Sequence, residues 1–371
     1  MTGDTDLTRG RETRGGNGGS RFRLLPSERS DISSILALAK SKGAADVHLV
    51  AGSPLLFRIQ SELVPITRQL LGAETVRHLS YCLLNSEQIE RFERDLDIDF
   101  MTTSPDHMRY RVNVSYNDGK VGAVIRLLPG EPLPLEEIRL PESVTRLTRA
   151  RKGLILITGS TSQGKTTTLA SLIDAINRRH RKHIVTIEDP VEYLHINKNS
   201  IIRQREVGRD THSFAHGLRA ALRQDADIIA IGEMRDYETI KIALTAAEAG
   251  VLVLSTLHII SIDKIIERLL AYAPEGGHGQ IRTLLAEALL CVIHQELLPT
   301  PSGGKRVASE VLFATEAVRN LIRNRGTYHL RSVVAMGQRF GMQTMRASLD
   351  QLRDEGMISD SLHRLVLEHY Q

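Results

Sequence analysis

The sequence GLILITGSTSQGKTTT, Gly153 to Thr168, decides how the rest of the chain is interpreted. It opens with an apolar run of β-branched and leucine side chains that ends at Thr158, which predicts a buried strand. A turn that fits G-x-x-x-x-G-K-[ST] follows from Gly159 to Thr166, and residues 169–179 have the pattern of a helix. A strand, a glycine loop and a helix in this order indicate a phosphate-binding loop and not a chance glycine turn.

The residue types of this loop suit ATP with Mg²⁺. Backbone N–H groups can approach phosphate oxygens only where no Cβ intrudes, which Gly159 and Gly164 permit. The following helix directs its positive N-terminal end at the phosphates. We expect the Lys165 ammonium to contact the β- and γ-phosphates and the Thr166 hydroxyl to ligate Mg²⁺. The predicted nucleotide-binding residues are Gly159, Ser160, Thr161, Ser162, Gln163, Gly164, Lys165, Thr166 and Thr167.

The composition of the chain argues against several classes of protein. A chain of 371 residues suits two domains better than one, and 48 Lys and Arg against 44 Asp and Glu is too small a basic excess to indicate nucleic acid. The two cysteines, Cys82 and Cys291, cannot form a disulfide framework or a four-cysteine zinc site, and they fit a reducing cytoplasm. No apolar run has the length of a membrane span and no secretory signal opens the chain, so we expect any membrane association to be peripheral.

Changes in pattern predict the domain organisation. Residues 1–28 are rich in Gly, Arg, Thr and Asp and predict a disordered tail. Residues 29–128 alternate short strands and helices and predict a small α+β domain. The proline-rich stretch 129–150 predicts a linker that leads into a short helix, and residues 151–371 predict the nucleotide domain with a helical C-terminal region.

Strands and helices alternate along the nucleotide domain. After the first strand, further strands are predicted at 183–188, 227–232 and 251–257, with helices between them. This alternation predicts an α/β fold with a mostly parallel sheet and phosphate loops at the carboxyl ends of its strands. Beyond it, a helix is predicted at 279–295, a strand at 306–313 and further helices up to residue 368.

Three polar residues directly follow predicted strands of this sheet. Glu188 ends the strand in HIVTIEDPVEY, Glu233 follows the strand in ADIIAIGEMRD, and His258 follows the strand in VLVLSTLH. A Glu at such a position can orient or deprotonate the attacking water or hold a Mg²⁺-bound water. We predict that Glu233 does so, that Glu188 shapes the same shell, and that His258 contacts the γ-phosphate. A solvated loop acid and a structural histidine are the alternatives for each residue alone, but their coincidence favours a hydrolytic site.

Arginines are also expected near the site, because the transition state of phosphoryl transfer spreads negative charge over the γ-phosphoryl oxygens. The sequence does not choose among the candidates, and surface ion pairs are the alternative for most of them. The candidates are Arg203, Arg205, Arg219, Arg223 and Arg235 in the nucleotide domain, and Arg58, Arg111 and Arg126 in the first domain.

Taken together, these motifs resemble the secretion ATPase superfamily of type II secretion and type IV pili. Four boxes match in order: the Walker A box GSTSQGKTTT, the Asp box TIEDPVEY, the Walker B box IIAIGEMRDYETI and the His box STLH. Within the superfamily the chain resembles the PilT-type retraction ATPases of twitching motility, because AVRNLIR at 317–323 and GMQTM at 341–345 are similar to motifs of that branch. The four-cysteine element typical of extension and secretion ATPases has no counterpart here.

The resemblance implies a PAS-like first domain and a RecA-like second domain that assemble as a hexameric ring with ATP between the domains. It implies a place at the cytoplasmic face of the inner membrane, with a membrane platform protein and indirectly pilin as partners, and no nucleic acid. By position, Glu188 matches the Asp-box acid, Glu233 the Walker B glutamate and His258 the His-box histidine. Arg111 and Arg126 lie where arginines of the family approach the nucleotide.

Some residues depart from the family pattern and leave alternatives open. Ser160 and Ser162 stand where the Walker A loop usually has Pro and Gly, and Ile259 and Ile260 follow the His box in place of small polar residues. One alternative is an extension or secretion ATPase of the same superfamily. A second is a nucleotide-gated scaffold with negligible turnover, which the Ile259-Ile260 pair supports. A third is a nucleic-acid motor, suggested only by the basic pI of about 9.1.

Overall fold

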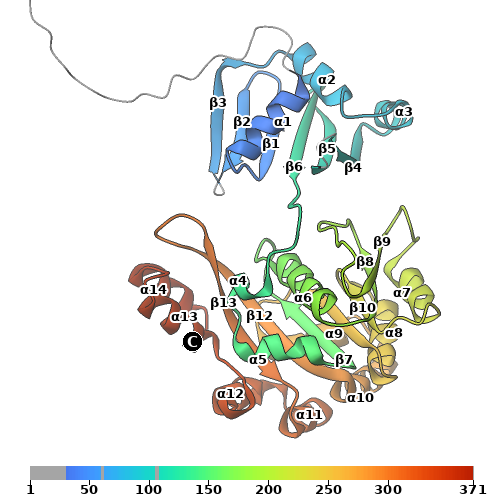
Figure 1. Ribbon diagram of the computed structural model, residues 1–371, viewed down its shortest axis with the longest axis vertical. Helices are drawn as coiled ribbons and strands as arrows, with labels where there is room; N and C mark the ends of the chain where they lie inside the picture. The colour runs from blue at the N-terminus through green and yellow to red at the C-terminus, as the bar shows by residue number, and fades with distance from the viewer. Residues whose placement is uncertain (1–30, 60–61, 105–107, 371) are drawn as a thin grey trace, which may run out of the picture. The chain divides into compact units, whose positions relative to one another are not determined.

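The structure of the chain is a computed structural model that describes residues 31–59, 62–104 and 108–370 (Figure 1). The predicted tail 1–28 lies outside these residues. Contacts divide the chain after Leu127 into two units, and the second begins at Leu128. The helices of the described part of the chain are all too short or too polar to span a bilayer.

The first unit is an α+β domain built on one antiparallel sheet of order β3-β2-β1-β6-β5-β4. Its core includes Phe57, Phe92 and Ile125, all fully buried. A tight turn at Asp118 and Gly119, both with positive φ, joins β5 to β6 as the sequence predicts. The elements are α1 (Ile32–Ser41), β1 (Asp46–Leu49), β2 (Pro54–Ile59), β3 (Glu62–Leu70), α2 (Ala73–Tyr81), α3 (Ser86–Asp95), β4 (Asp97–Thr103), β5 (Arg109–Asn117) and β6 (Lys120–Leu127).

The second unit alternates strands and helices and ends in helices. Its first part comprises α4 (Leu135–Ile138), α5 (Glu142–Thr145), a 3-10 helix (Arg146–Arg149), β7 (Gly153–Thr158), α6 (Lys165–Arg179), β8 (His183–Glu188), β9 (Ile201–Glu206), α7 (Phe214–Leu222), β10 (Ile228–Ile231), α8 (Tyr237–Glu248) and β11 (Leu252–Leu257). Its second part comprises α9 (Ile265–Ala271), α10 (His278–Ala288), β12 (Leu289–Pro299), β13 (Lys305–Phe313), α11 (Glu316–Arg323), α12 (Leu330–Met336), α13 (Met345–Asp354) and α14 (Asp360–Glu368), with 3-10 turns between several of them.

A seven-stranded sheet of order β13-β12-β7-β11-β10-β8-β9 forms the centre of this unit. All neighbouring strands are parallel except the edge strand β13, which pairs antiparallel with β12. The predicted parallel sheet is therefore confirmed. Because β7 is an interior strand of the sheet, all six of its residues are buried.

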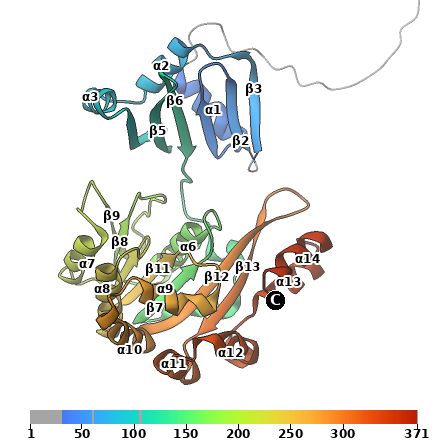
Figure 2. The same ribbon diagram turned by 180° about the vertical axis from the view of Figure 1, so that it is seen from behind.

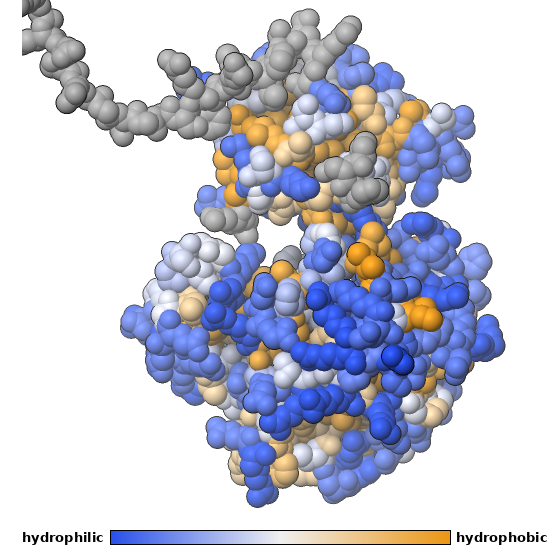
Figure 3. All heavy atoms as spheres, in the orientation of Figure 1, coloured by the Kyte–Doolittle hydropathy of each residue, from blue (hydrophilic) through white to orange (hydrophobic). Residues whose placement is uncertain are grey.

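Helices cover both faces of the sheet, as Figures 1 and 2 show from opposite sides. Leu154 and Leu156 of β7 point into a core shared with α8, α9 and α10, whereas Ile155 and Ile157 point into a core shared with α4 and α6. This alternation follows from the two-residue period of a strand. Hydrophilic residues dominate the face of this unit that Figure 3 presents.

The structure differs from the sequence predictions in three places. The helix predicted at 279–295 ends at Ala288, and Leu289–Pro299 forms β12, because this apolar run pairs with both β7 and β13. Strand β9 was not predicted, since Arg and Gln interrupt its apolar pattern. The predicted linker 129–150 belongs mostly to the second unit, because Leu135, Ile138 and Val144 are buried in one of its cores.

Candidate active site

The loop between β7 and α6 takes the conformation that its glycines permit. Gly159 has φ +147° and Gly164 has φ +79°, both outside the range that side chains favour. A Cβ at Gly159 would lie 2.5 Å from the carbonyl oxygen of Gln295 on β12, so only glycine fits there. The loop backbone therefore lies directly against β12.

The backbone donors of this loop fit a polyphosphate. The first intrahelical bond of α6 runs from Thr168 N to Gly164 O, so the N–H groups of the first turn have no partner within the helix. Donors at a helix N-terminus, together with those of the glycine loop before it, form an anion-binding cradle. Thr166 lies in the first turn of α6, where its hydroxyl can join the ligands of a phosphate-bound Mg²⁺.

Lys165 is held at the centre of the site. Only 6% of its surface is exposed, and its Nζ donates to the carbonyl oxygens of Gly159 at 2.9 Å and Ser160 at 2.6 Å. The same Nζ lies 3.2 Å from His258 Nδ1. Burial lowers the pKa of Lys165, and the charges of Glu233 and Glu192 partly oppose that shift. The ammonium is thus pre-positioned for a phosphate that replaces the carbonyl contacts.

Glu233 and His258 meet beside this lysine. Glu233 follows β10, and His258 follows β11, the next strand of the sheet. His258 Nε2 lies 3.3 Å from Glu233 Oε2, which also accepts from Arg235 Nε at 2.7 Å. The Glu233 side chain is only 15% exposed. The two imidazole nitrogens therefore bridge the lysine of the loop and the acid of the neighbouring strand.

Glu188, the third predicted catalytic residue, has different neighbours. Its Oε1 accepts from Thr186 Oγ1 at 2.6 Å and from Gln204 Nε2 at 3.1 Å, so side chains of β8 and β9 orient it. Sequence reasoning missed Glu192, although it stands in the TIEDPVEY stretch: after Glu233, its charge opposes the lowering of the Lys165 pKa by burial.

Two further contacts around the loop were not predicted. The Tyr193 hydroxyl lies 2.8 Å from Thr167 Oγ1 in the first turn of α6. Gln163 is bound by β12, because its carbonyl oxygen accepts from Gln295 Nε2 at 2.6 Å and its side-chain oxygen accepts from the backbone N–H of Leu297. Tyr193 is in the quoted Asp-box stretch, whereas no local signal marks the residues of β12.

The two isoleucines after the His box differ in their burial. Ile259 is buried in the core that α8, α9 and α10 share with the sheet, and Ile260 is 61% exposed. Ile259 therefore anchors the chain just after His258, while the imidazole itself contacts Lys165 and Glu233. The departure from the family pattern leaves this histidine in contact with the site.

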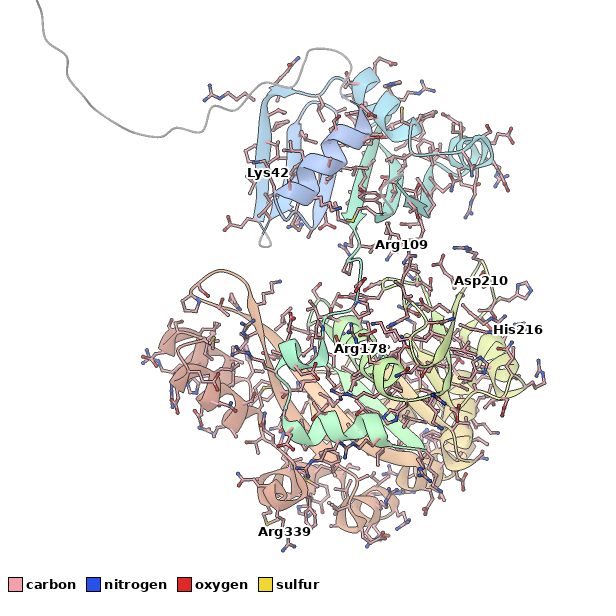
Figure 4. All side chains as sticks on the ribbon, viewed as in Figure 1. Lys42, Arg109, Arg178, Asp210, His216 and Arg339 are labelled. Carbon is pink, nitrogen blue, oxygen red and sulfur yellow. The ribbon has the colours of Figure 1, made fainter. Side chains whose placement is uncertain are left out.

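The predicted arginines are dispersed. Arg219 on α7 pairs with Glu238 on α8, and Arg223 follows α7 in an exposed position. Arg205 on β9 donates to the carbonyl oxygen of Asp210, which Figure 4 labels on the loop after that strand. Arg203, also on β9, is exposed. Within the described residues, none of these four forms a hydrogen bond or ion pair with Lys165, Glu233 or His258. Among the candidate arginines of the second unit, Arg235 contacts the site through Glu233.

Two of the three candidate arginines of the first unit, Arg58 and Arg126, share the carboxylate of Asp46. Arg126 Nε donates to Asp46 Oδ1 at 2.8 Å, and Arg58 Nε lies 3.4 Å from the other oxygen of this buried carboxylate. Arg111 lies opposite Arg126 in the β5–β6 register and 3.9 Å from Asp99. The register thus places Arg58, Asp46, Arg126 and Arg111 in one row across the sheet, on one face of the first unit.

Comparison with known proteins agrees with the motifs. Residues 28–361 match the family model of the type II/IV secretion system protein. The chain is 41% identical over 329 residues to the type IV pilus retraction ATPase PilT of Pseudomonas aeruginosa, covering 89% of this chain and 96% of that protein. It is 42% identical over 311 residues to a twitching motility protein of Neisseria gonorrhoeae, covering 83% of each.

Solved structures show the same fold. A crystal structure of the pilus retraction motor PilT with bound ADP has a TM-score of 0.81 at 40% identity and covers 90% of this chain and 96% of that one. The X-ray structure of the Legionella pneumophila ATPase DotB has a TM-score of 0.83 at 26% identity, with coverages of 94% and 99%. The predicted fold class, an α/β nucleotide domain after a small α+β domain and with a helical C-terminal region, is confirmed. The chain belongs to the type II/IV secretion system protein family.

Proposed function

We propose that this chain is an ATP-hydrolysing motor that retracts type IV pili. The observation that carries the proposal is the contact chain from Lys165 through His258 to Glu233 beneath the phosphate-binding loop. The similarity to a pilus retraction ATPase over 96% of that protein's length supports the type IV pilus as the structure on which the motor acts. The likeness to a PilT structure that holds ADP supports nucleotide as the ligand.

Binding of the nucleotide is assigned to the loop and the start of α6. The N–H groups from Ser160 to Thr167 bind the phosphates, and Lys165 moves its ammonium from the carbonyls of Gly159 and Ser160 to the β- and γ-phosphates. Thr166 would hold Mg²⁺, which supplies charge neutralisation across the two phosphates when bound. Because the cradle is already formed, little ordering is needed on binding.

Hydrolysis is assigned to Glu233. Its carboxylate is buried except for 15% of its side-chain surface, and Arg235 and His258 hold it in place. It accepts a proton from, or orients, the water that attacks the γ-phosphorus. His258 contacts both the acid and the loop lysine, so loss of the γ-phosphate changes its hydrogen bonds. Glu188, oriented by Thr186 and Gln204, supports the water shell.

The motor works as an assembly. We propose a homo-hexamer at the inner membrane that acts on a platform protein and, through it, on pilin, because the relatives act in pilus retraction and twitching motility. Arg111 and Arg126 of the first unit are proposed to reach a nucleotide and stabilise the charge of its transition state. The cycle of binding, hydrolysis and release then drives domain movement.

Replacement of the acid tests the chemistry. Glu233→Gln keeps the size of the side chain but removes the base, so we expect turnover to fall by about 100-fold or more with ADP and ATP binding retained. Steady-state phosphate release and nucleotide binding are measured on the assembled protein. Glu238→Gln, an exposed acid on α8 that pairs with Arg219, is the matched control and keeps its turnover. Normal turnover of the Glu233 variant would remove this residue from the mechanism.

The load is tested in cells. A strain that lacks the chain should accumulate surface pili and lose twitching motility, whereas loss of an extension motor would leave the cells bald. Pilus counts by electron microscopy decide between the two. Lys165→Ala expressed in that strain should fail to restore movement, since it lacks the phosphate-binding ammonium.

A further inference from the structure

Strand β12 supports the phosphate-binding loop at both of its ends. At the far end, Gln295 and the N–H of Leu297 bind Gln163. At the near end, Thr158 is the last residue of β7 and the register partner of His294. Thr158 Oγ1 lies 3.1 Å from His294 Nδ1. The position of β12 therefore sets the position of the loop backbone from Thr158 to Gln163.

His294 links this support to the C-terminal helices. It is 1% exposed, and its second nitrogen, Nε2, lies 3.0 Å from the hydroxyl of Tyr370, which follows α14. The Tyr370 hydroxyl in turn donates to Glu296 Oε1 at 2.6 Å. One hydrogen-bonded chain thus runs from Glu296 through Tyr370 and His294 to Thr158.

The direction of each bond in this chain is fixed by chemistry. An ionised carboxylate only accepts, so the single hydroxyl proton of Tyr370 goes to Glu296, and the Tyr370 oxygen must accept from His294 Nε2–H. A neutral imidazole then has only an acceptor left at Nδ1, which receives the hydroxyl proton of Thr158. Burial and the nearby charge of Lys165 lower the pKa of His294 to about 4, in keeping with a neutral ring. If either the Tyr370 or the Thr158 hydroxyl is removed, the hydrogen bonds no longer fix which nitrogen of His294 carries the proton.

The C-terminal helices are packed where they can hold Tyr370. Leu349 of α13 and Val366 of α14 share a core with Leu298 of β12 and Ala308 of β13. The N–H of Ser309 on β13 also donates to Ser348 Oγ on α13 at 3.0 Å. The same strand that supports the loop is thus packed on one side against the helices that carry Tyr370.

We propose that Tyr370 is a positioning residue for the phosphate-binding loop, acting through His294 on Thr158. The inference rests on the proposed nucleotide-binding function and names a residue outside the four sequence boxes. Thr158 directly precedes Gly159, whose carbonyl oxygen binds Lys165 Nζ at 2.9 Å and whose backbone packs against Gln295. A loosened Thr158 therefore shifts the first donors of the loop and the resting place of the lysine, and so weakens nucleotide binding more than it slows chemistry.

The test compares isosteric variants of the full chain. Tyr370→Phe keeps the ring and removes the hydroxyl, and Thr158→Val removes the other end of the chain. Each should raise the Kd for a fluorescent ADP analogue and the KM for ATP about three- to tenfold, the effect of one hydrogen bond, with kcat changed less than twofold. His294→Asn keeps an acceptor near Thr158 but cannot reach Tyr370, so it should match Tyr370→Phe. The double variant of Tyr370 and His294 should be no worse than either single one.

A matched control separates positioning from simple helix stability. His363 on α14 bonds Asp350 on α13 at 2.7 Å, and this pair is not part of the hydrogen-bonded chain from Glu296 to Thr158. His363→Gln should lower the thermal midpoint without changing the Kd or KM. The proposal is overturned if Tyr370→Phe and Thr158→Val leave the Kd unchanged, or if the His363 variant raises the Kd equally. If Tyr370→Phe does not fold, the His294 and Thr158 variants decide alone.

The measurement of ADP binding tests the positioning role of Tyr370 separately from the ATPase function. ADP binding does not require hydrolysis. A wild-type chain that binds ADP without turnover would contradict the ATPase mechanism, and a rise in Kd in the Tyr370 variant would still support the positioning role. A wild-type chain that binds no ADP would overturn both.

Discussion

Glu310 on β13 is a carboxylate in an unfavourable place. It is 8% exposed, and burial raises its pKa to about 7, with Asp263 adding to the shift. Arg331 and the backbone N–H of Met345 oppose the shift without cancelling it. Its register partner across the strands is His294, which is itself buried. At neutral pH the folded chain therefore carries a partly protonated acid that the unfolded chain would ionise.

This burial predicts a pH dependence with a definite sign. A folded-state pKa above the unfolded value of about 4.5 gives stability that is present below pH 4.5 and lost as the pH rises through 7. Glu310→Gln removes the ionisation but keeps an acceptor for Met345. We expect the variant to be more stable than the wild type by about 1–3 kcal/mol at pH 8, and the difference to shrink to less than about 1 kcal/mol near pH 5, because stability is fully regained only below the unfolded pKa. Urea unfolding at both pH values measures it; an equal difference at both would contradict the assignment.

At the scale of elements, the junction between α10 and β12 decides the site. Helix α10 ends at Ala288 and the strand begins at Leu289 without an intervening loop. The last carbonyl groups of a helix lack intrahelical partners. The Arg319 guanidinium on α11 acts as their hydrogen-bond donor. It donates to the carbonyl oxygen of Ala286, to that of Glu287 at 2.8 Å and to that of Leu289 at 3.0 Å. One side chain thus ends the helix and starts the strand that supports the loop.

Loss of this guanidinium should loosen the junction. Arg319→Met keeps the aliphatic stem and removes three charge-assisted bonds, so we expect a loss of about 2–3 kcal/mol in the unfolding of the second unit. The control is Arg323→Met on the same helix, whose partners are the exposed side chains of Glu287, Glu316 and Asn320, and which should cost clearly less, because solvent screens exposed ion pairs. Denaturant unfolding compares them. Equal losses would show that the carbonyl contacts are unimportant.

At the scale of the whole molecule, the two units have separate cores, and the phosphate-binding loop belongs to the second. A ligand that binds only the folded state stabilises it by mass action. With ADP at about 100 times its Kd, we expect the thermal transition of the second unit to rise by about 5–10 °C. Lys165→Ala should show almost no rise, because its phosphate contact is gone. Scanning calorimetry measures both; an equal rise in the variant would contradict the role of Lys165.

The local sequence was sufficient to predict the residues at the centre of the site. The glycines, Lys165 and the start of α6 are contiguous in sequence, so the motif alone predicted the loop. Glu233 and His258 are far from it in sequence, but the carboxyl ends of parallel strands meet at one edge of a sheet. That rule predicted their convergence, and the contacts among Lys165, His258 and Glu233 agree with it.

What the sequence by itself determined was the nucleotide loop, the parallel sheet and the family, because each depends on short motifs or on a repeating period. Only the tertiary structure decided that Leu289–Pro299 is a strand, that Glu192 acts on Lys165, and that Tyr370 reaches Thr158 through His294. His294 and Tyr370 are separated from their partners by 136 and 76 residues. No local preference encodes such pairs, since they arise only when both elements pack against the same strands.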